Sequence, residues 1–438
     1  MNWAELAQRW RNRTEGRTVS VQVGHRLHLW RRRLLVFLAV LGPGLITSNV
    51  DNDAGGIATY SLAGAQFGYT LLWSLLPMTV ALYVTQEMCA RMGVVTGKGL
   101  SDLIREEFGF RPTFFVMLAG LAVDLGNTVA EFAGVAASMQ IFGISRYISV
   151  PLAALLVWVL VVRGTYRQVE KVFLVLCSFY IAYILSAFLA HPDWRQALHY
   201  TLLPHLEFTT GYLVMLTALV GTTIAPWQFF YIQAGVVEKR VGPRQLRHSQ
   251  ADVFLGSLTS MAVVFFIIVC TAATLHRAGI VQITDAAQAA QALAPLAGHW
   301  AATLFAFGLL NASLFAASIL PLSTAHVICE GLGFEAGIDR KLSEAPLFYG
   351  LYTGLIAVGA GVILLPRAPL LKILLFSQVA NGIWLPVVLI FMLLLINRRD
   401  LMGDRVNGRT FNLIAWATAV TMIAATVALI VAALAGYA

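Results

Sequence analysis

The chain has 438 residues, of which 58% are hydrophobic and only 12% are charged, and its formal net charge is +8. One water-soluble core cannot hide so large an apolar fraction, so the composition excludes an ordinary soluble domain and indicates a protein that folds in lipid. The positive charge raises nucleic-acid binding as an alternative, which the placement of the charges decides.

Apolar segments that are long enough to cross a bilayer recur from Leu34 to the C-terminus. A hydrocarbon core about 30 Å thick needs roughly 20 apolar residues in a helix. The first 33 residues are polar and rich in arginine, so they predict a basic cytoplasmic tail and not a cleaved signal peptide. Eleven transmembrane helices are expected, at 34–66, 70–90, 113–143, 148–163, 172–190, 211–236, 253–275, 302–328, 346–365, 370–397 and 411–436.

The lysine and arginine residues are distributed unevenly between the two sides of such a bundle. If the N-terminus is cytoplasmic, the tail and the inner loops hold all but five of the 30, and the five are Arg146, Arg195, Arg277, Arg367 and Lys372. Cytoplasmic loops carry this excess. The pattern predicts a multi-pass cell-membrane protein with a cytoplasmic N-terminus and an extracellular or periplasmic C-terminus. The expected partner is the lipid bilayer, and no nucleic acid is expected.

Two of the predicted helices contain residues that interrupt a helix near the middle of the membrane. The first contains the segment from Asp51 to Gly56, and the sixth contains Ala225 and Pro226. Proline removes a backbone donor, and paired glycines tolerate unwound backbone. A simple kink at Pro226 and close packing at the glycines are the alternatives. Because free backbone groups at that depth are stable only beside a cavity or a ligand, the two breaks predict a binding site.

The two breaks occupy equivalent positions in two halves of five helices each. The halves are residues 34–190 and 211–397, and an extracellular loop at 191–210 joins them. A cytoplasmic loop and helix 11 follow at 398–438. A cytoplasmic N-terminus makes the halves inverted repeats. The pattern predicts an all-α transporter whose substrate lies between two discontinuous helices.

Two aspartates, Asp51 and Asp53, lie within the first break. A charged side chain at the centre of a bilayer costs at least about 2.5 kcal/mol. Carboxylate oxygens beside exposed carbonyl oxygens are the ligands that hard cations such as Mg²⁺, Ca²⁺ and Mn²⁺ prefer. We favour a cation site, and the alternative for each aspartate is an N-cap of the second half-helix.

Residues 41–73, LGPGLITSNVDNDAGGIATYSLAGAQFGYTLLW, resemble the first helix of the Nramp (natural resistance-associated macrophage protein) divalent-metal transporters. Further resemblances follow in the same order, at MGVVTGKGLSDL (92–103), GTYRQVEKVF (164–173), FSQVANGIWLP (376–386) and INRRDLMG (396–403). Together they cover nearly the whole chain. The resemblance implies the inverted-repeat fold shared with the leucine transporter and the transport of divalent metal ions.

Two ligand positions differ from the pattern of that family. Its DPGN metal motif corresponds to residues 53–56, where Gly56 replaces an asparagine ligand, and its MPH motif corresponds to residues 225–227, where Ala225 replaces a thioether. The remaining all-oxygen site resembles the Nramp-related magnesium transporters. Because sulfur favours transition metals and Mg²⁺ usually keeps several waters, we expect Mg²⁺ as the favoured substrate, with Mn²⁺ sharing the path.

The candidate site combines side chains and backbone carbonyls from several helices. For Gln378, which occupies the glutamine position of the family's tenth helix, an interhelical hydrogen bond is the alternative. The candidate ligands are Asp53, the backbone carbonyls near Asp53 and Thr222, and the Gln378 side chain, with Asp51, Asn49 and Thr223 acting through water and with Gly56 and Ala225 at the two altered positions.

The same resemblance argues against proton coupling. The histidines of proton-coupled relatives correspond to Trp227 and Ile232, and the acidic pair of the third helix corresponds to Thr128 and Glu131. Tryptophan and isoleucine do not titrate, so we expect uncoupled uptake by alternating access. Two charges that move down a membrane potential gain about 4.6 kcal/mol per 100 mV, which corresponds to roughly a thousandfold accumulation.

Three alternatives stay open from the sequence. They are a proton-coupled Mn²⁺ or Fe²⁺ importer of the same family, an amino-acid transporter of the same fold, and a non-transporting sensor. Two aspartates at the break oppose the carboxylate of an amino acid. The sequence has no P-loop, HExxH or CxxC pattern, so we expect no enzyme, no cofactor besides the transported metal and no obligate protein partner. His326, near a helix end, is expected to be structural.

Overall fold

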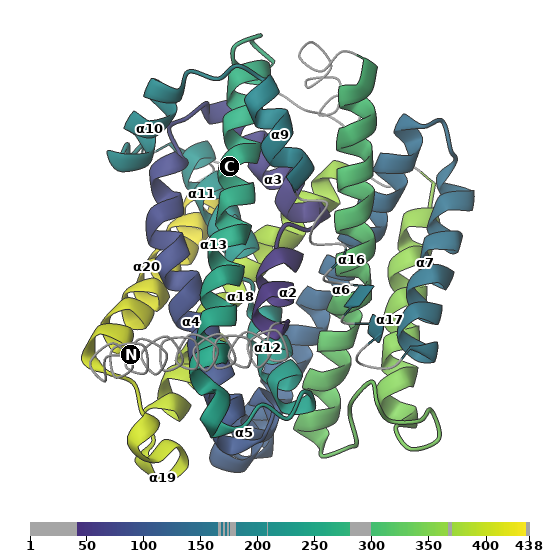
Figure 1. Ribbon diagram of the computed structural model, residues 1–438, viewed down its shortest axis with the longest axis vertical. Helices are drawn as coiled ribbons and strands as arrows, with labels where there is room; N and C mark the ends of the chain where they lie inside the picture. Colours follow the sequence, from purple (N-terminus) through teal and green to yellow (C-terminus); the bar gives the residue numbers. More distant parts are fainter. Residues whose placement is uncertain are drawn as a thin grey trace, which may run out of the picture. The chain divides into compact units, whose positions relative to one another are not determined.

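The computed structural model describes residues 42–164, 181–207, 209–280, 299–366 and 370–434, together with residues 168, 169, 171, 172 and 175. The regular structure of these residues is helical, without a strand among them (Figure 1). The predicted basic tail, residues 1–33, lies outside the described residues, as does part of the predicted fifth helix. The described chain agrees with the prediction of an all-α protein.

Both predicted helix breaks are present. The first helix consists of α2 (Pro43–Val50) and α3 (Ala54–Phe67), and the sixth consists of α11 (Thr210–Thr223) and α12 (Pro226–Glu238). Proline opens α2 and α12, where its missing N–H has no intrahelical acceptor to lose. The first break is shorter than expected, because Gly55 and Gly56 belong to the first turn of α3 and are not unwound.

The other helices follow in chain order, and among the described residues eight segments are long and apolar enough to span a membrane by length and composition. α4 is not among the eight, and α2, α3 and α9 are shorter than a span. The remaining elements are η1 (Leu72–Ser74), α4 (Leu75–Thr96), α5 (Leu100–Phe108), α6 (Phe110–Ile141), α7 (Arg146–Arg163), α9 (Ile181–Leu189), α10 (Trp194–Leu202), η2 (Pro243–Gln245), α13 (Leu246–Thr271), the π-helical turn η3 (Ala272–His276), α16 (His299–Leu332), α17 (Pro346–Leu364), α18 (Leu370–Ile396), α19 (Arg399–Met402), η4 (Gly403–Arg405) and α20 (Arg409–Leu434).

Two segments that the sequence analysis treated as loops contain helices. α10 lies within the predicted outer loop at 191–210, and its N-terminus is capped by Asp193, whose Oδ1 accepts hydrogen bonds from the amides of Arg195 at 3.0 Å and Gln196 at 3.1 Å. α5 lies between α4 and α6, with apolar residues on one face. These short amphipathic helices were not predicted, because neither is long or apolar enough to resemble a span.

The broken helices lie inside the bundle, and other helices form its periphery. α13 packs along both α2 and α3, while α6, α11 and α18 also contact α3 (Figure 1). By contrast, α7 and α20 expose large apolar side chains, such as Leu155 at 58% and Leu413 at 71%. Exposed apolar surface of this extent marks a membrane-facing region. The two breaks are therefore held at the centre of a helical bundle with an apolar exterior.

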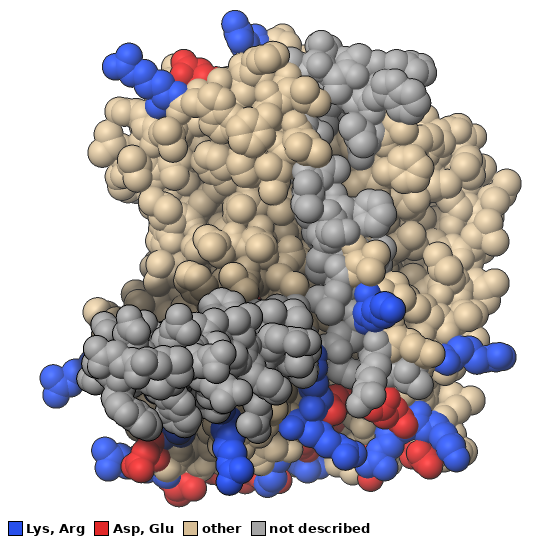
Figure 2. Space-filling view, viewed as in Figure 1, with Lys and Arg blue, Asp and Glu red and all other residues tan. Residues whose placement is uncertain are grey.

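Charged side chains gather at one end of the bundle, which Figure 2 shows at the bottom. α5, α19 and the C-terminal end of α12 lie there (Figure 1), and we call it the basic end. Its described basic residues include Lys98, Arg105, Arg244, Arg398 and Arg405. This clustering agrees with the cytoplasmic loops that the sequence predicts, and the orientation in the membrane stays a prediction.

Candidate functional site

The first break is shaped by two carboxylates at the N-terminus of α3. Oδ1 of Asp53 accepts a hydrogen bond from the amide of Gly56 at 2.5 Å, and Oε2 of Glu131 accepts one from the amide of Ala54 at 3.2 Å. Both satisfy amides that the helix itself leaves without acceptors. Of the two aspartates that we considered as N-caps, Asp53 caps α3 and Asp51 does not. Glu131, on α6, lies against the same helix end.

The start of α2 is fixed by a carboxylate from another helix. Asp252 of α13 accepts hydrogen bonds from the amides of Gly42 at 3.1 Å, Gly44 at 2.7 Å and Leu45 at 3.2 Å. A carboxylate is favourable there, because the amide end of a helix carries partial positive charge. This cap holds α2 against α13 and so positions the carbonyl end of α2 at the break.

The second break lies beside the first. The side-chain amide of Gln228, in the first turn of α12, donates hydrogen bonds to Oδ1 of Asp51 and to the backbone carbonyl of Thr223, the latter at 3.4 Å. The hydroxyl groups of Tyr60 and Thr223 are 3.4 Å apart. These contacts join α2, α3, α11 and α12 through polar groups at the level of the two breaks.

Oxygens from both breaks meet at Gly56. A Cβ atom built on Gly56 would lie 2.7 Å from the carbonyl oxygen of Asp51, 3.1 Å from Oγ1 of Thr222 and 3.2 Å from Oδ1 of Asp53. A backbone oxygen at 2.7 Å leaves no room for any side chain. Glycine at this position therefore allows a carbonyl, a hydroxyl and a carboxylate to converge, all of them hard oxygen donors.

Three of the buried oxygens around the breaks have no hydrogen-bond partner. They are Oδ2 of Asp51, Oγ1 of Thr222 and Oε1 of Glu131, in residues that are at most 1% exposed. An unsatisfied buried polar group costs about 1–3 kcal/mol, and more when it is charged, so native proteins contain few of them. Their clustering is the arrangement that a bound cation with its waters would satisfy.

Gln378 lies next to this cluster but is engaged by neighbours on its own helix. A Cβ on Gly55 would come within 2.0 Å of Nε2 of Gln378, so this amide packs directly over the glycine. Its Oε1 accepts a hydrogen bond from Asn381 at 3.0 Å, and Asn381 in turn pairs with Asn127 of α6. The interhelical amide network that we considered as the alternative is present, through Asn381.

Some predicted site residues are directed elsewhere. The Asn49 amide donates hydrogen bonds to the carbonyl of Leu45 at 2.8 Å and to Thr259 of α13 at 3.1 Å. The Thr128 hydroxyl donates to the carbonyl of Asp124 one turn earlier in α6. Both donor groups are therefore satisfied by other parts of the bundle.

The residues of the second break supply shape and backbone groups. Ala225 precedes Pro226 and has no side-chain donor, and its carbonyl accepts a hydrogen bond from the amide of Gln228 at 3.1 Å. The Trp227 ring is buried at 1% exposure, and the Trp227 carbonyl accepts a hydrogen bond from Ser323 at 3.0 Å. Neither side chain can bind a metal ion or carry a proton.

Sequence reasoning missed a chain of amides that supports Asp51. Oε1 of Gln228 accepts a hydrogen bond from Gln86 of α4 at 2.6 Å, and Oε1 of Gln86 accepts one from Ser48 of α2 at 2.7 Å. All three residues are fully buried. A glutamine two residues after the helix-breaking proline and a polar residue inside an apolar span were the signals that pointed to them.

The donor chemistry of the site is therefore oxygen. Within the described part of the chain, no group of three His, Cys, Asp or Glu side chains is placed to hold a metal ion. The cysteines described there, Cys89, Cys270 and Cys329, are buried elsewhere in the bundle. Any cation at the breaks would be bound by a few carboxylate, hydroxyl and carbonyl oxygens together with water.

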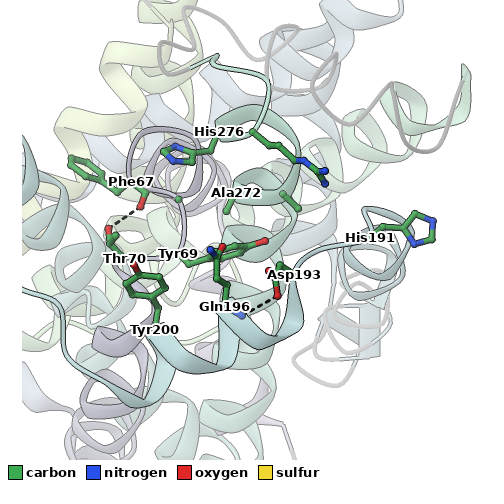
Figure 3. Close-up of a pocket in the computed structure, with 12 residues that line it drawn as sticks. Phe67, Tyr69, Thr70, His191, Asp193, Gln196, Tyr200, Ala272 and His276 are labelled. Carbon is green, nitrogen blue, oxygen red and sulfur yellow. Dashed lines mark hydrogen bonds between the residues drawn. The ribbon is translucent and has the colours of Figure 1, made fainter.

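A second polar space lies at the end of the bundle opposite the basic end. It has a volume of about 490 Å³ and is lined by the C-terminal end of α3, the start of α10 and the π-helical turn η3. Figure 3 shows Tyr69, Asp193 and Gln196 toward its centre and His191 turned away from them. π-Helical turns often occur at functional sites. The space adjoins α3 and is a polar opening on that side of the bundle.

Comparison with known sequences identifies one family. A family model described as natural resistance-associated macrophage protein-like matches residues 44–432. The divalent metal cation transporter MntH of Deinococcus radiodurans is 29% identical over 407 residues, covering 90% of this chain and 89% of that protein. A protein with the same description from Granulibacter bethesdensis is 28% identical over 425 residues, covering 92% and 90%.

Solved structures share the fold. The crystal structure of a manganese transporter from Eremococcus coleocola, in complex with an aromatic bis-isothiourea substituted compound, has a TM-score of 0.76 to this chain at 21% identity. The likeness covers 90% of this chain and 86% of that chain. It confirms the predicted all-α fold of a polytopic membrane protein.

Proposed function

Because this chain belongs to the natural resistance-associated macrophage protein (Nramp) family, we propose that it carries divalent metal cations across a membrane through the space between its two helix breaks. The chain is a transporter and not an enzyme, and the metal ion is its substrate. The observation that carries the proposal is the convergence of the Asp51 carbonyl, Thr222 Oγ1 and Asp53 Oδ1 at Gly56. These oxygens come from both broken helices, where substrate sites of such folds lie.

In this proposal Asp53 is the main ligand of the metal ion. Its carboxylate, the Asp51 carbonyl and the Thr222 hydroxyl supply the direct contacts. Asp51, held by Gln228, and Glu131 each have an unpartnered oxygen that a metal-bound water would reach. Asn49 and Thr128 leave the proposed set, since their polar groups bond to α13 and to α6 itself.

Two ions compete as the favoured substrate. The matched relatives are described as divalent metal cation or manganese transporters, which favours the proton-coupled Mn²⁺ or Fe²⁺ importer over the magnesium carrier. The side chains of this site favour a hard ion, because Ala225 offers no sulfur and Gly56 offers no amide. Mg²⁺ binds through few protein oxygens and several waters, which suits the donors around Gly56. We therefore keep Mg²⁺ as the proposal and Mn²⁺ as the second candidate.

Uncoupled transport is proposed on the same grounds. Trp227 and Ile232 do not titrate, and both are buried. Glu131 is the one acidic group of α6 that contacts the site, where it already accepts the amide of Ala54. A membrane potential alone supplies about 2.3 kcal/mol per charge per 100 mV, so a doubly charged ion needs no second ion to be accumulated.

The test is uptake of Mg²⁺, Mn²⁺ and Ca²⁺ into proteoliposomes by wild type, Asp53→Ala and Gly56→Ala. We expect uptake to fall at least about a hundredfold in Asp53→Ala, since it removes a charged ligand. Gly56→Ala is expected to abolish uptake, because its Cβ would displace the Asp51 carbonyl.

Two controls separate the site from the fold. Asp400→Ala removes an exposed carboxylate at the basic end, and Gly350→Ala adds a methyl group where no atom lies within 4 Å. Both are expected to transport normally. Wild-type uptake that persists in Asp53→Ala and Gly56→Ala would contradict the proposed site, and preference for Mn²⁺ with acidification of the lumen would replace the magnesium proposal with the proton-coupled one.

A further inference from the structure

A polar cavity at the basic end lies apart from the candidate metal site. It has a volume of about 300 Å³ and opens where α5, α12 and α16 come together (Figure 1). α12 runs from the second helix break to this cavity. Its first residue, Pro226, adjoins the metal site, and its last, Glu238, lines the cavity. The cavity is thus connected to the site by one rigid half-helix.

A buried histidine bridges two helices in this cavity. The His326 ring on α16 is 3% exposed, with Nε2 3.6 Å from Oε1 of Glu238 and Nδ1 3.5 Å from Oε1 of Glu330. The Glu238 carboxylate also accepts a hydrogen bond from the amide of Ile338 at 2.9 Å, which ties the loop after α16 to the end of α12. When protonated, the ring therefore lies between two carboxylates from two different helices.

Parts of this cluster have no hydrogen-bond partner. Oε2 of Glu330 and Nδ1 of His326 are buried in the cavity wall without one, and Glu330 is 9% exposed. A Cβ on Gly99 would lie 1.9 Å from that Glu330 oxygen, so the Glu330 carboxylate packs directly against the start of α5. The Glu330 carboxylate approaches the ring through its other oxygen, Oε1, and this attraction depends on the proton of the ring.

We propose that His326, Glu238 and Glu330 form a proton-operated latch that holds α12 against α16 at the basic end. A protonated ring attracts both glutamates and closes the latch. A neutral ring leaves two carboxylates facing each other, and the end of α12 is released. Because α12 begins beside Ala225, its release moves one wall of the site. The protein would then respond to pH without carrying protons; this inference rests on the proposed transport function.

Other charged groups lie around the cavity. Burial and the nearby Glu330 carboxylate raise the pKa of Asp102 on α5 to about 6, while Arg105 lies 3.2 Å from it. As pH rises through that value, Asp102 gains a negative charge, which repels the Glu330 carboxylate and attracts the protonated ring. The charged groups elsewhere at the cavity are Lys98, paired with Glu106 at 2.6 Å, Glu335, paired with Arg340 at 2.8 Å, and Asp339 near Glu238.

The experiment measures conformation and not transport. Spin labels at Arg244→Cys, just after α12, and Leu332→Cys, at the end of α16, report the distance across the latch in protein kept free of divalent metal. Measurements at about pH 5.5 and about pH 8 bracket the ordinary histidine pKa of about 6.5. We expect the longer-distance population to grow about fivefold at the higher pH, the lower end of typical coupling between two sites.

Two variants and one control decide the outcome. His326→Gln keeps a polar side chain of similar length but cannot be charged, and Glu238→Gln removes one carboxylate; both are expected to abolish the pH response. His205→Gln is the matched control. This exposed histidine also pairs with a glutamate, with Nε2 3.1 Å from Oε1 of Glu207, but it lies away from the latch. A response that survives His326→Gln, or closure caused by added Mg²⁺ at both pH values, would overturn the latch. A latch that responds in a protein without uptake would refute only the transport proposal.

Discussion

A single hydrogen atom at Gly56 leaves room for three oxygens, and this residue shows how one position decides the chemistry of a site. Any larger side chain would meet the Asp51 carbonyl at 2.7 Å. The family motif has an asparagine ligand at this position, whereas Gly56 in this chain has no side chain and leaves the space open. Thr222 is important for the same reason. Its hydroxyl oxygen lies 3.1 Å from the position that a Cβ on Gly56 would occupy, and it has no hydrogen-bond partner.

Replacing Thr222 with valine tests this interpretation at the scale of one atom. Thr222→Val keeps the shape of the side chain and removes only the hydroxyl, so we expect the KM for metal uptake to rise about tenfold, the lower end of effects seen for groups that support a metal. Thr217→Val on the same helix is the control, since its hydroxyl donates to the carbonyl of Leu213 and not to the site. Equal KM values for both variants would show that the Thr222 hydroxyl does not contact the metal ion.

Helix ends, more than helix lengths, determine this structure at the scale of elements. The sequence predicted both breaks, because aspartates, paired glycines and Ala225-Pro226 inside apolar segments are incompatible with continuous helices in lipid. It did not predict that Gly55 and Gly56 are helical, because an N-cap at Asp53 and the approach of Gln378 are tertiary features. Nor did it predict Gln228 beside Asp51, since that contact joins residues 177 positions apart.

The cap on α2 gives a prediction at this scale. Asp252→Asn replaces the oxygen that accepts the Gly44 amide with a donor, so we expect the stability to fall by about 1–2 kcal/mol, the upper part of the range for a lost cap. The unfolding temperature in detergent measures the loss. Asp193→Asn is matched to it, because one oxygen of Asp193 accepts both amides at the start of α10 and an asparagine retains that oxygen. A loss of stability equal to that of the control would show that the three bonds to α2 contribute little.

The whole molecule combines an apolar exterior, one basic end and a polar interior at mid-bundle. Leu155 and Leu413 on peripheral helices face outward, whereas Asp51, Asp53 and Glu131 are fully buried. The comparisons confirm the family and the fold, and they leave the ion and the coupling as proposals. Moving a doubly charged ion through such a molecule is an electrical event, so the potential across the membrane is the driving force to vary.

Metal accumulation under a clamped potential is the measurement that tests the central claim most directly. Proteoliposomes held at about 100 mV, negative inside, are predicted to accumulate Mg²⁺ up to about a thousandfold, with the same limit whether or not a pH gradient is imposed. Accumulation that follows the pH gradient, with Mn²⁺ in place of Mg²⁺, would support the proton-coupled importer. No accumulation of any divalent cation by folded protein would contradict transport between the two breaks.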